Sequence, residues 1–316
     1  MTINIVSRVS VDTVLVLDSD QALMSLQSKD FVAMYSNSAD IPKFETLAVS
    51  VPKQFVYHVQ LNRPDKLNAM NRKMWLEVGE CFQKLGDNAD CRAIVLSAAG
   101  RLFTAGIDLK DFAKMGPQLA EIDDVARRCR MLEKTIQLYQ DSISSLEKCP
   151  KPVICAVHDA CIGAGVNLIT AADIRWCTNN AWFQVREVAI GMAADVGVLQ
   201  RLPKVVGNDS LVRELAFTGR KFVADEAKEF GMVSKVFETK ESMVEKAVEL
   251  AEEISGLSPV AVQLTKRNLV YSRDHSVQEG LDHIRIWNQT MLQSEDFLNA
   301  TMAQATKSPP PTFSKL

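Results

Sequence analysis

Segments with the two-residue period of a β-strand alternate with segments of helical period between residues 50 and 237. Strand patterns cover 55–61, 91–97, 153–157, 174–177, 182–185 and 232–237. Helical patterns cover 68–85, 124–148, 163–172, 209–218 and 225–230. From Lys240 onward the pattern is almost entirely helical. Strands that alternate with helices, followed by helices alone, predict an α/β core with a helical C-terminal region.

The first fifty residues carry no sustained period except over 9–17. That stretch is too short and too alternating for a secretory signal, and its neighbours are too acidic for a mitochondrial transit peptide. We therefore expect four parts in the chain. They are a weakly specified N-terminal extension (1–50), a core domain (51–250), a C-terminal helical region (251–306) and a flexible tail (307–316).

Composition excludes several classes of protein. With 47% hydrophobic and 24% charged residues, the 316-residue chain has the balance of a folded globular protein. A net charge of −3 offers no basic surface, so we expect no nucleic-acid partner. The apolar run 152–172 contains His158, Asp159 and Asn167, which argues against a membrane span. Seven scattered cysteines and four distant histidines indicate reduced core thiols and no metal site.

The chain ends in Ser314, Lys315 and Leu316, a tripeptide that acts as a peroxisomal address when a receptor binds it at the free C-terminus. Pro309–Pro311 lies just before it and favours an extended, accessible tail. We therefore expect a peroxisomal protein that binds the import receptor through this tripeptide, with a mitochondrial pool as the lesser alternative.

Two glycine-containing loops, 98–109 and 160–167, each follow a predicted buried strand. Small residues at a helix start leave backbone N–H groups free to face a ligand. Two such loops side by side would form an oxyanion hole, although glycine spacing by itself favours tight turns and close helix packing. Neither loop has the lysine of a phosphate-binding loop or the glycine spacing of a dinucleotide fold.

Two acids, Glu187 and Asp195, stand in local sequence rich in Ala and Val. Poor solvation would raise the pKa of each carboxyl group toward the range that is useful for proton transfer. Structural roles remain open for both. Glu187 would otherwise pair with Arg186 or Arg201, and Asp195 would otherwise cap the helix that follows it.

Taken in order, several segments resemble the crotonase (enoyl-CoA hydratase/isomerase) superfamily over about residues 53–300. The matching segments are 61–69, 103–108, 151–153, 163–165, 171–175, 200–202 and 231–233. Segments 183–188, 191–197, 272–277 and 313–316 are similar to the dienoyl-CoA isomerases of that superfamily, and a typical hydratase has Gly where Asp195 stands. The resemblance implies a spiral of β-β-α turns and assembly into homotrimers or homohexamers.

The resemblance also implies the site. The backbone N–H groups of Ile107 and Ala164 would bind the thioester oxygen of an acyl-CoA. The lining residues would be Ala105, Gly106, Ile107, Asp108, Leu109 and Ala164. The implied reaction converts 3,5-dienoyl-CoA to 2,4-dienoyl-CoA during β-oxidation of unsaturated fatty acids. Glu187 would take the C2 proton and Asp195 would supply a proton at C6, or the reverse. CoA is part of the substrate, and no separate cofactor or metal is implied.

Two departures from the family pattern matter. Asn167 stands where the family carries a third acid, which in the hydratases is a catalytic Glu; this weighs against hydratase activity more than against isomerisation. Asn167 therefore leaves an alternative in which this protein is a non-catalytic or impaired acyl-CoA-binding homologue. A Δ3-Δ2-enoyl-CoA isomerase, which needs one acid, is a further alternative. Ala164 replaces a usual Gly, so its Cβ would narrow the approach and disfavour positive φ.

Overall fold

The structure is a computed structural model that describes residues 41–316. Most of the N-terminal extension expected over 1–50, including the segment 9–17, lies outside these residues. The first strand, β1 (Leu47–Lys53), crosses the boundary that we expected at residue 50. The last part of that segment therefore belongs to the folded domain, because it pairs with the strand that follows it.

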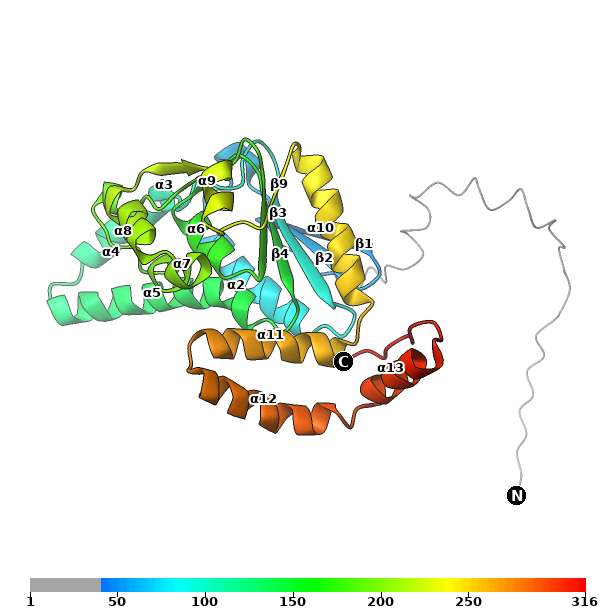
Figure 1. Ribbon diagram of the computed structural model, residues 1–316. Helices are drawn as coiled ribbons and strands as arrows, with labels where there is room; N and C mark the ends of the chain where they lie inside the picture. Colours follow the sequence, from blue (N-terminus) through cyan, green and yellow to red (C-terminus); the bar gives the residue numbers. More distant parts are fainter. Residues whose placement is uncertain (1–40) are drawn as a thin grey trace, which may run out of the picture. The chain divides into compact units, whose positions relative to one another are not determined.

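Six strands form the main sheet, in the order β1-β2-β3-β4-β6-β9 (Figure 1). Besides β1 they are β2 (Val56–Leu61), β3 (Ala93–Ala98), β4 (Val153–Val157), β6 (Ile174–Thr178) and β9 (Lys235–Phe237). β1 runs antiparallel to β2, and all other neighbours are parallel. Parallel neighbours require long crossover connections, which the helices of this chain provide.

A second sheet of three strands contains β5 (Ala160–Ile162), β7 (Trp182–Gln184) and β8 (Lys221–Val223). β4 and β6 each lead through a short turn into a strand of this second sheet, and a helix follows. The chain therefore winds in β-β-α turns, which confirms the predicted fold. The strand predicted over 232–237 is shorter, and its first three residues make the turn before β9.

Helices fill the connections. They are α2 (Arg72–Asp87), α3 (Leu109–Phe112), α4 (Met115–Ala120), α5 (Val125–Lys148), α6 (Ala164–Thr170), α7 (Val198–Val206), α8 (Asp209–Thr218), α9 (Ala224–Glu229) and α10 (Lys240–Ser255), with 3₁₀ turns η1 (Pro64–Lys66) and η2 (Glu187–Ile190). α2 begins four residues later than its apolar period predicts. Leu67 and Asn68 have positive φ, and the side chain of Asn71 caps the helix by accepting from Met74 N–H.

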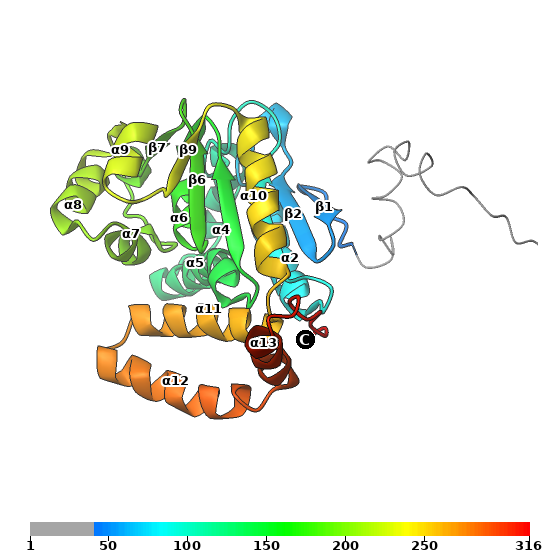
Figure 2. The ribbon, with the colours of Figure 1, turned by 45° about the vertical axis from the view of Figure 1, so that its right-hand side comes forward.

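The core lies on both faces of the main sheet because successive strand residues point to opposite sides. In β3, Ile94 and Leu96 pack into the larger cluster with α2 and α5. Val95 faces the other way and packs with Met243 and Ala247 of α10, which lies along that face of the sheet (Figure 2). All seven cysteines are free thiols, and six of them are buried in the core as predicted, whereas Cys129 is exposed.

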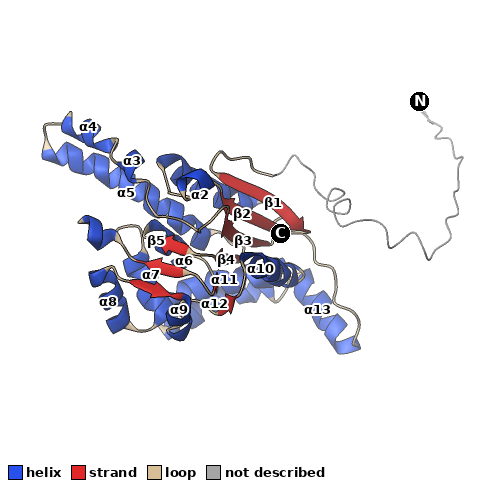
Figure 3. Cartoon of the chain, turned by 90° about the horizontal axis from the view of Figure 1, so that it is seen from above, coloured by secondary structure: helices blue, strands red, loops and turns tan. Residues whose placement is uncertain are grey.

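Three helices form the C-terminal region: α11 (Pro259–Arg273), α12 (Val277–Met291) and α13 (Glu295–Thr306), with α11 and α12 paired (Figure 1). Seen from above, α13 extends away from the other helices (Figure 3). Lys266 anchors α11 to the core. Its ammonium group lies 2.7 Å from Asp173 and donates to the carbonyl groups of Leu146 and Lys151. Within residues 41–316, no helix has the length and apolar character that crossing a membrane requires.

The tail beyond α13 has no helix or strand, but it is not free of the body as its composition suggests. The guanidinium group of Arg92 donates to the backbone carbonyls of Phe313 and Ser314, at 2.7 and 3.1 Å. Lys315 pairs with Asp90 at 2.5 Å. An extended segment leaves its carbonyl groups unpaired, and Arg92 supplies donors for them.

Candidate active site

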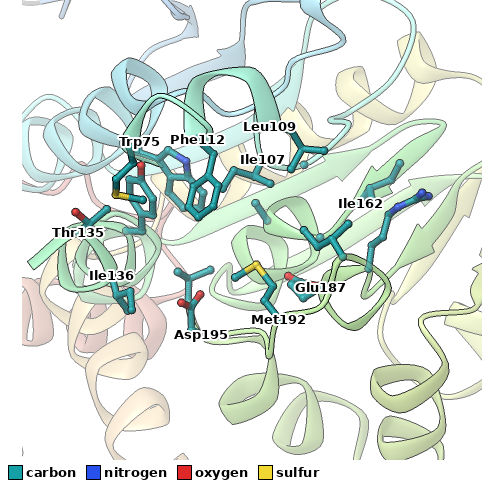
Figure 4. Close-up of a pocket in the computed structure, with 18 of the residues that line it drawn as sticks. Trp75, Ile107, Leu109, Phe112, Thr135, Ile136, Ile162, Glu187, Met192 and Asp195 are labelled. Atoms are coloured by element: carbon teal, nitrogen blue, oxygen red, sulfur yellow. The ribbon is translucent and has the colours of Figure 1, made fainter. Parts of the chain in front are cut away.

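An apolar cavity of about 250 Å³ lies beside the turn between β5 and α6. Its walls come from α2, α5, the loop before α3 and the segment between β7 and α7. In Figure 4, Trp75, Ile107 and Phe112 form one wall, and Glu187, Met192 and Asp195 lie opposite. Residues that are far apart in the sequence thus line one concave space, which is typical of a small-molecule binding site.

The two glycine-containing loops do lie side by side, as predicted. Thr104 N–H donates to Ala160 C=O at 3.0 Å, and Ile162 N–H donates to Thr104 C=O at 3.2 Å. Gly106 has φ of +88°, and a Cβ at that position would stand 2.8 Å from the Ile162 carbonyl oxygen. Glycine is therefore required at Gly106 for both its backbone angle and the close contact of the loops.

The segment before α2 holds the first loop on both sides of Ile107. Met70 N–H donates to Gly106 C=O at 2.7 Å, and Asp108 N–H donates to Met70 C=O at 3.0 Å. Between these two bonds the N–H of Ile107 has no acceptor among residues 41–316, and the same is true of the N–H of Ala164. Both residues line the cavity, so both N–H groups are available to a ligand oxygen.

The substitution of Ala164 for Gly carries no backbone strain. Ala164 is the first residue of α6, and the positive φ of this turn falls on Gly163, which has φ of +50°. The expected penalty for φ at Ala164 is therefore wrong, because the neighbouring glycine takes up the special conformation.

Glu187 lies on the cavity wall with its carboxylate buried. Oε1 accepts a hydrogen bond of 2.9 Å from the Asn167 amide, and Oε2 is buried without a partner in the described part of the chain. Burial raises the pKa of Glu187; nearby donors, including Asn167, oppose that effect, and the charge of Asp195 adds to it.

Glu187 does not form the alternative ion pair with any of the described residues. Arg201 pairs instead with Glu147, at 3.0 Å, and Arg186 donates to the side chain of Gln184 at 3.4 Å. A buried carboxylate without a cation is costly to ionise, which is why the pKa of Glu187 rises.

Asn167 is fully buried, and its amide orientation is set by its neighbours. The backbone N–H of Val198 donates to Oδ1 at 2.6 Å, and an N–H can only donate, so the amide nitrogen must face the other way. That nitrogen donates to Gly163 C=O and to Glu187. The residue in the third-acid position thus holds the Glu187 carboxylate in place.

Asp195 also faces the cavity, and burial raises its pKa. It is not the cap of α7, because Gly197 occupies the N-cap position and no side chain caps that helix. The two acids lie at different points along the cavity. Glu187 lies toward Ile162, whereas Asp195 lies on the side of Thr135 and Ile136 of α5 (Figure 4).

Asp108 is the one predicted lining residue that does not face the cavity. Of the six, Ala105, Gly106, Ile107, Leu109 and Ala164 line it. The Asp108 carboxylate instead caps α3 and pairs with Arg63 at 3.1 Å. Arg63 also donates to Ala69 C=O, so this ion pair ties the loop that carries Ile107 to the segment before α2.

Sequence reasoning missed residues that approach the site from distant helices. Gln140 of α5 donates through its side-chain amide to the backbone carbonyl of Asp195 at 2.7 Å. Trp75 of α2 and Tyr139 of α5 stack with ring centroids 4.5 Å apart and form part of the apolar wall. Their spacing along the helices matches ordinary core packing, so only the shape of the cavity reveals them.

Comparison with known proteins identifies the class that this fold and site define. The family model "Enoyl-CoA hydratase/isomerase" matches residues 52–310, and the chain belongs to this family. A putative enoyl-CoA hydratase from Streptomyces coelicolor has a similar structure, with a TM-score of 0.78 and 28% identity over 88% of this chain and 98% of that one. The family that the sequence motifs resemble is therefore confirmed.

Two curated relatives carry a more particular name. The chain is 56% identical to "Delta(3,5)-Delta(2,4)-dienoyl-CoA isomerase, mitochondrial" of Pongo abelii, over 86% of this chain and 84% of that protein. It is 43% identical to the "peroxisomal" enzyme of the same name from Arabidopsis thaliana, over 83% and 93%. Relatives are thus named for both organelles, which does not support ranking a mitochondrial location as the lesser alternative.

Proposed function

We propose that this protein is an enzyme that isomerises 3,5-dienoyl-CoA to 2,4-dienoyl-CoA in the β-oxidation of unsaturated fatty acids. One observation carries the proposal. Two carboxylates with raised pKa, Glu187 and Asp195, lie at different points along an apolar cavity that also receives two backbone N–H groups without an acceptor among residues 41–316. The names of the relatives from Pongo abelii and Arabidopsis thaliana support the same reaction.

The first step removes a proton from C2 of the acyl chain. Glu187 takes this proton on Oε2, the oxygen that has no partner in the described part of the chain. The electron pair delocalises into a dienolate whose charge reaches the thioester oxygen. The N–H groups of Ile107 and Ala164 stabilise that charge, each by about 3–4 kcal/mol.

The second step delivers a proton to C6. Asp195 supplies it from the α5 side of the cavity, where its raised pKa increases the fraction of the acid form. The C=C bonds then stand at C2 and C4, conjugated with the thioester carbonyl. Glu187 ends protonated and Asp195 ionised, so a proton must return to Asp195 before the next turnover. The cycle oxidises and reduces nothing and, we propose, needs no cofactor beyond the CoA of the substrate.

The test is the conversion of 3,5-octadienoyl-CoA by the purified full chain, followed as a rise in near-UV absorbance. Glu187→Gln and Asp195→Asn should each lower kcat by about 10²–10⁴-fold. Glu245→Gln, at an exposed acid of α10 away from the cavity, is the matched control and should keep the parent rate. If both cavity variants keep the parent rate, the mechanism is wrong.

Isotope exchange assigns the two roles. In D₂O, Asp195→Asn should still exchange the C2 hydrogens of recovered substrate, because Glu187 can form the dienolate and return a deuteron. Glu187→Gln should abolish that exchange. The opposite pattern would reverse the assignment of base and acid.

Asn167 is the observation that favours a second candidate, a non-catalytic acyl-CoA-binding homologue. Measurable turnover of the dienoyl substrate by the parent chain would exclude that candidate. A Δ3-Δ2-enoyl-CoA isomerase, which requires one acid, would instead convert a 3-enoyl-CoA faster than the 3,5-diene and would tolerate the loss of Asp195.

The proposal extends to location and assembly. Peroxisomal import through Ser314, Lys315 and Leu316 is supported by the peroxisomal relative and by the exposed side chain of Leu316. A receptor that binds the tripeptide would replace the contacts of Ser314 with Arg92 and of Lys315 with Asp90. A homotrimer or homohexamer is supported by apolar side chains exposed on the C-terminal helices. They include Leu269, Val277, Leu281, Ile286, Leu298 and Met302. Deleting the tripeptide should abolish import, and light scattering should report three or six chains.

A further inference from the structure

A second cavity, of about 710 Å³, adjoins the apolar one. The two cavities share the lining residues Phe112, Met115, Thr135 and Tyr139, so they meet beside α5. The second cavity differs in its chemistry. It is lined by five cationic side chains and one carboxylate, which are Arg72, Lys114, Arg127, Arg130, Lys134 and Asp111.

Two of these cations lack a partner within residues 41–316. Lys114 pairs with Asp111 at 3.0 Å, and Arg127 pairs with Asp124 at 3.3 Å. Arg130 and Lys134 form no ion pair or hydrogen bond with any residue of 41–316, although both line the cavity. They stand one turn apart on α5, a spacing at which like charges cost about 0.2–0.5 kcal/mol. Both residues are exposed, and the stability of α5 does not explain why two cations stand at this spacing.

The direction of the substrate follows from the proposed function, on which this inference rests. The thioester oxygen lies at Ile107 and Ala164, C2 lies at Glu187, and C6 lies at Asp195. Since Asp195 is on the side of Thr135 and Ile136, the acyl chain runs toward α5 (Figure 4). A longer chain continues past Thr135, a residue shared by both cavities, into the cationic one.

A methyl-ended chain gains little from that second space, because cationic side chains are strongly hydrated and an alkyl chain would displace their water. A carboxylate at the far end of the chain has the complementary charge. A guanidinium group can bind it through two parallel hydrogen bonds, and an ammonium group adds a second cation.

We propose that the cationic cavity binds the ω-carboxylate of a dicarboxylic acyl-CoA, and that this enzyme accepts 3,5-dienoyl-CoA substrates that end in a carboxylate. Arg130 and Lys134 are the residues that bind it. Chain length then decides the preference, since only a chain longer than the apolar cavity carries its carboxylate to Arg130 and Lys134. The reaction at C2 and C6 is the same for both kinds of substrate.

The kinetic test compares methyl-ended and ω-carboxyl 3,5-dienoyl-CoA esters of equal length, from eight to sixteen carbons. In the parent chain, the ratio of kcat/KM for carboxyl-ended over methyl-ended substrate should rise at least tenfold with length and fall with added salt. The double variant Arg130→Gln/Lys134→Gln should lose most of that rise, because its KM for long carboxyl-ended substrates increases. Lys148→Gln, at the other end of α5, is the matched control and should keep it.

Two results would overturn the proposal. One is a ratio near one at every chain length in a protein that converts 3,5-octadienoyl-CoA, which leaves the proposed function intact. The other is an equal loss for both substrates in the double variant, which would show that Arg130 and Lys134 do not recognise the ω-carboxylate.

A binding measurement separates this inference from the isomerase activity. Calorimetry with saturated hexadecanedioyl-CoA and hexadecanoyl-CoA should give a Kd at least tenfold lower for the dicarboxylic ester, and the double variant should lose the difference. That result without any dienoyl-CoA turnover would reject the proposed reaction and retain the ω-carboxylate site. Equal Kd values in the parent chain would overturn the site.

Discussion

The amide nitrogen of Asn167 donates a hydrogen bond of 2.9 Å to Oε1 of Glu187, inside a site where the second carboxylate oxygen has no partner among the described residues. An ionised acid at the position of Asn167 would repel Glu187, whereas the amide stabilises its ionised form. Although Asn167 departs from the family pattern, its side chain holds and orients the Glu187 carboxylate. The position of the third acid therefore still contributes to the site.

Replacing Asn167 by Asp should shift the acid limb of the pH–rate profile. The new carboxylate removes a donor from Glu187 and adds a like charge, and both changes raise the pKa of Glu187 further. The acid limb of kcat/KM should therefore move to higher pH than in the parent. Asn299→Asp, on exposed α13, makes the same chemical change far from the cavity and should leave the limb in place. An unmoved limb in Asn167→Asp would contradict the proposed role of Glu187.

Replacing Ala164 by Pro should remove one oxyanion donor while it keeps the helix. Pro is favoured at the first position of a helix, where its missing N–H breaks no helical bond, and Ala164 is the first residue of α6. We expect kcat to fall about 10²–10³-fold with little change in circular dichroism. Ala164→Gly keeps the N–H and should stay close to the parent rate. Equal rates for the two variants would mean that this N–H does not bind the thioester oxygen.

Replacing Gln140 by Leu should lower kcat more than it raises KM. The side-chain amide of Gln140 holds the backbone carbonyl of Asp195, and the loss of one neutral hydrogen bond corresponds to about 0.5–1.5 kcal/mol, or roughly a two- to tenfold change. Gln137→Leu, on an exposed turn of the same helix, is the control. A pure loss of thermal stability, with kcat unchanged, would assign Gln140 a structural role only.

Glu187 should make folding stability depend on pH. Burial raises the pKa of Glu187 above its unfolded value, so the folded state binds more protons between the two pKa values. Its contribution to stability therefore falls as pH rises through that window, which begins near the unfolded value of about 4.5. The difference in Tm between Glu187→Gln and the parent should grow from pH 4.5 to pH 8, at about 2–4 °C for each 1 kcal/mol. A difference that is constant with pH would show that Glu187 titrates as an ordinary exposed acid.

The local sequence pattern predicts most of the helices and strands, because the period of the apolar residues and the residues that end helices act over short distances along the chain. The strand 153–157 and the helix 209–218 have the bounds that the pattern predicts. The start of α2 is different. It depends on the left-handed conformation of Leu67 and Asn68, which the neighbouring loop stabilises through Ala105 N–H and Thr104 Oγ1. No local period encodes such a contact.

The sequence by itself determined the family, the two glycine-containing loops and the pair of acids, because each can be recognised from short segments of neighbouring residues. Only the tertiary structure decided how they work together. It directs Asp108 to Arg63, brings Gln140 to Asp195, and aligns the Asn167 amide with Glu187. Hydrogen bonds and desolvation depend on distances of a few ångströms between residues far apart in the chain, and such distances exist only once the core has packed.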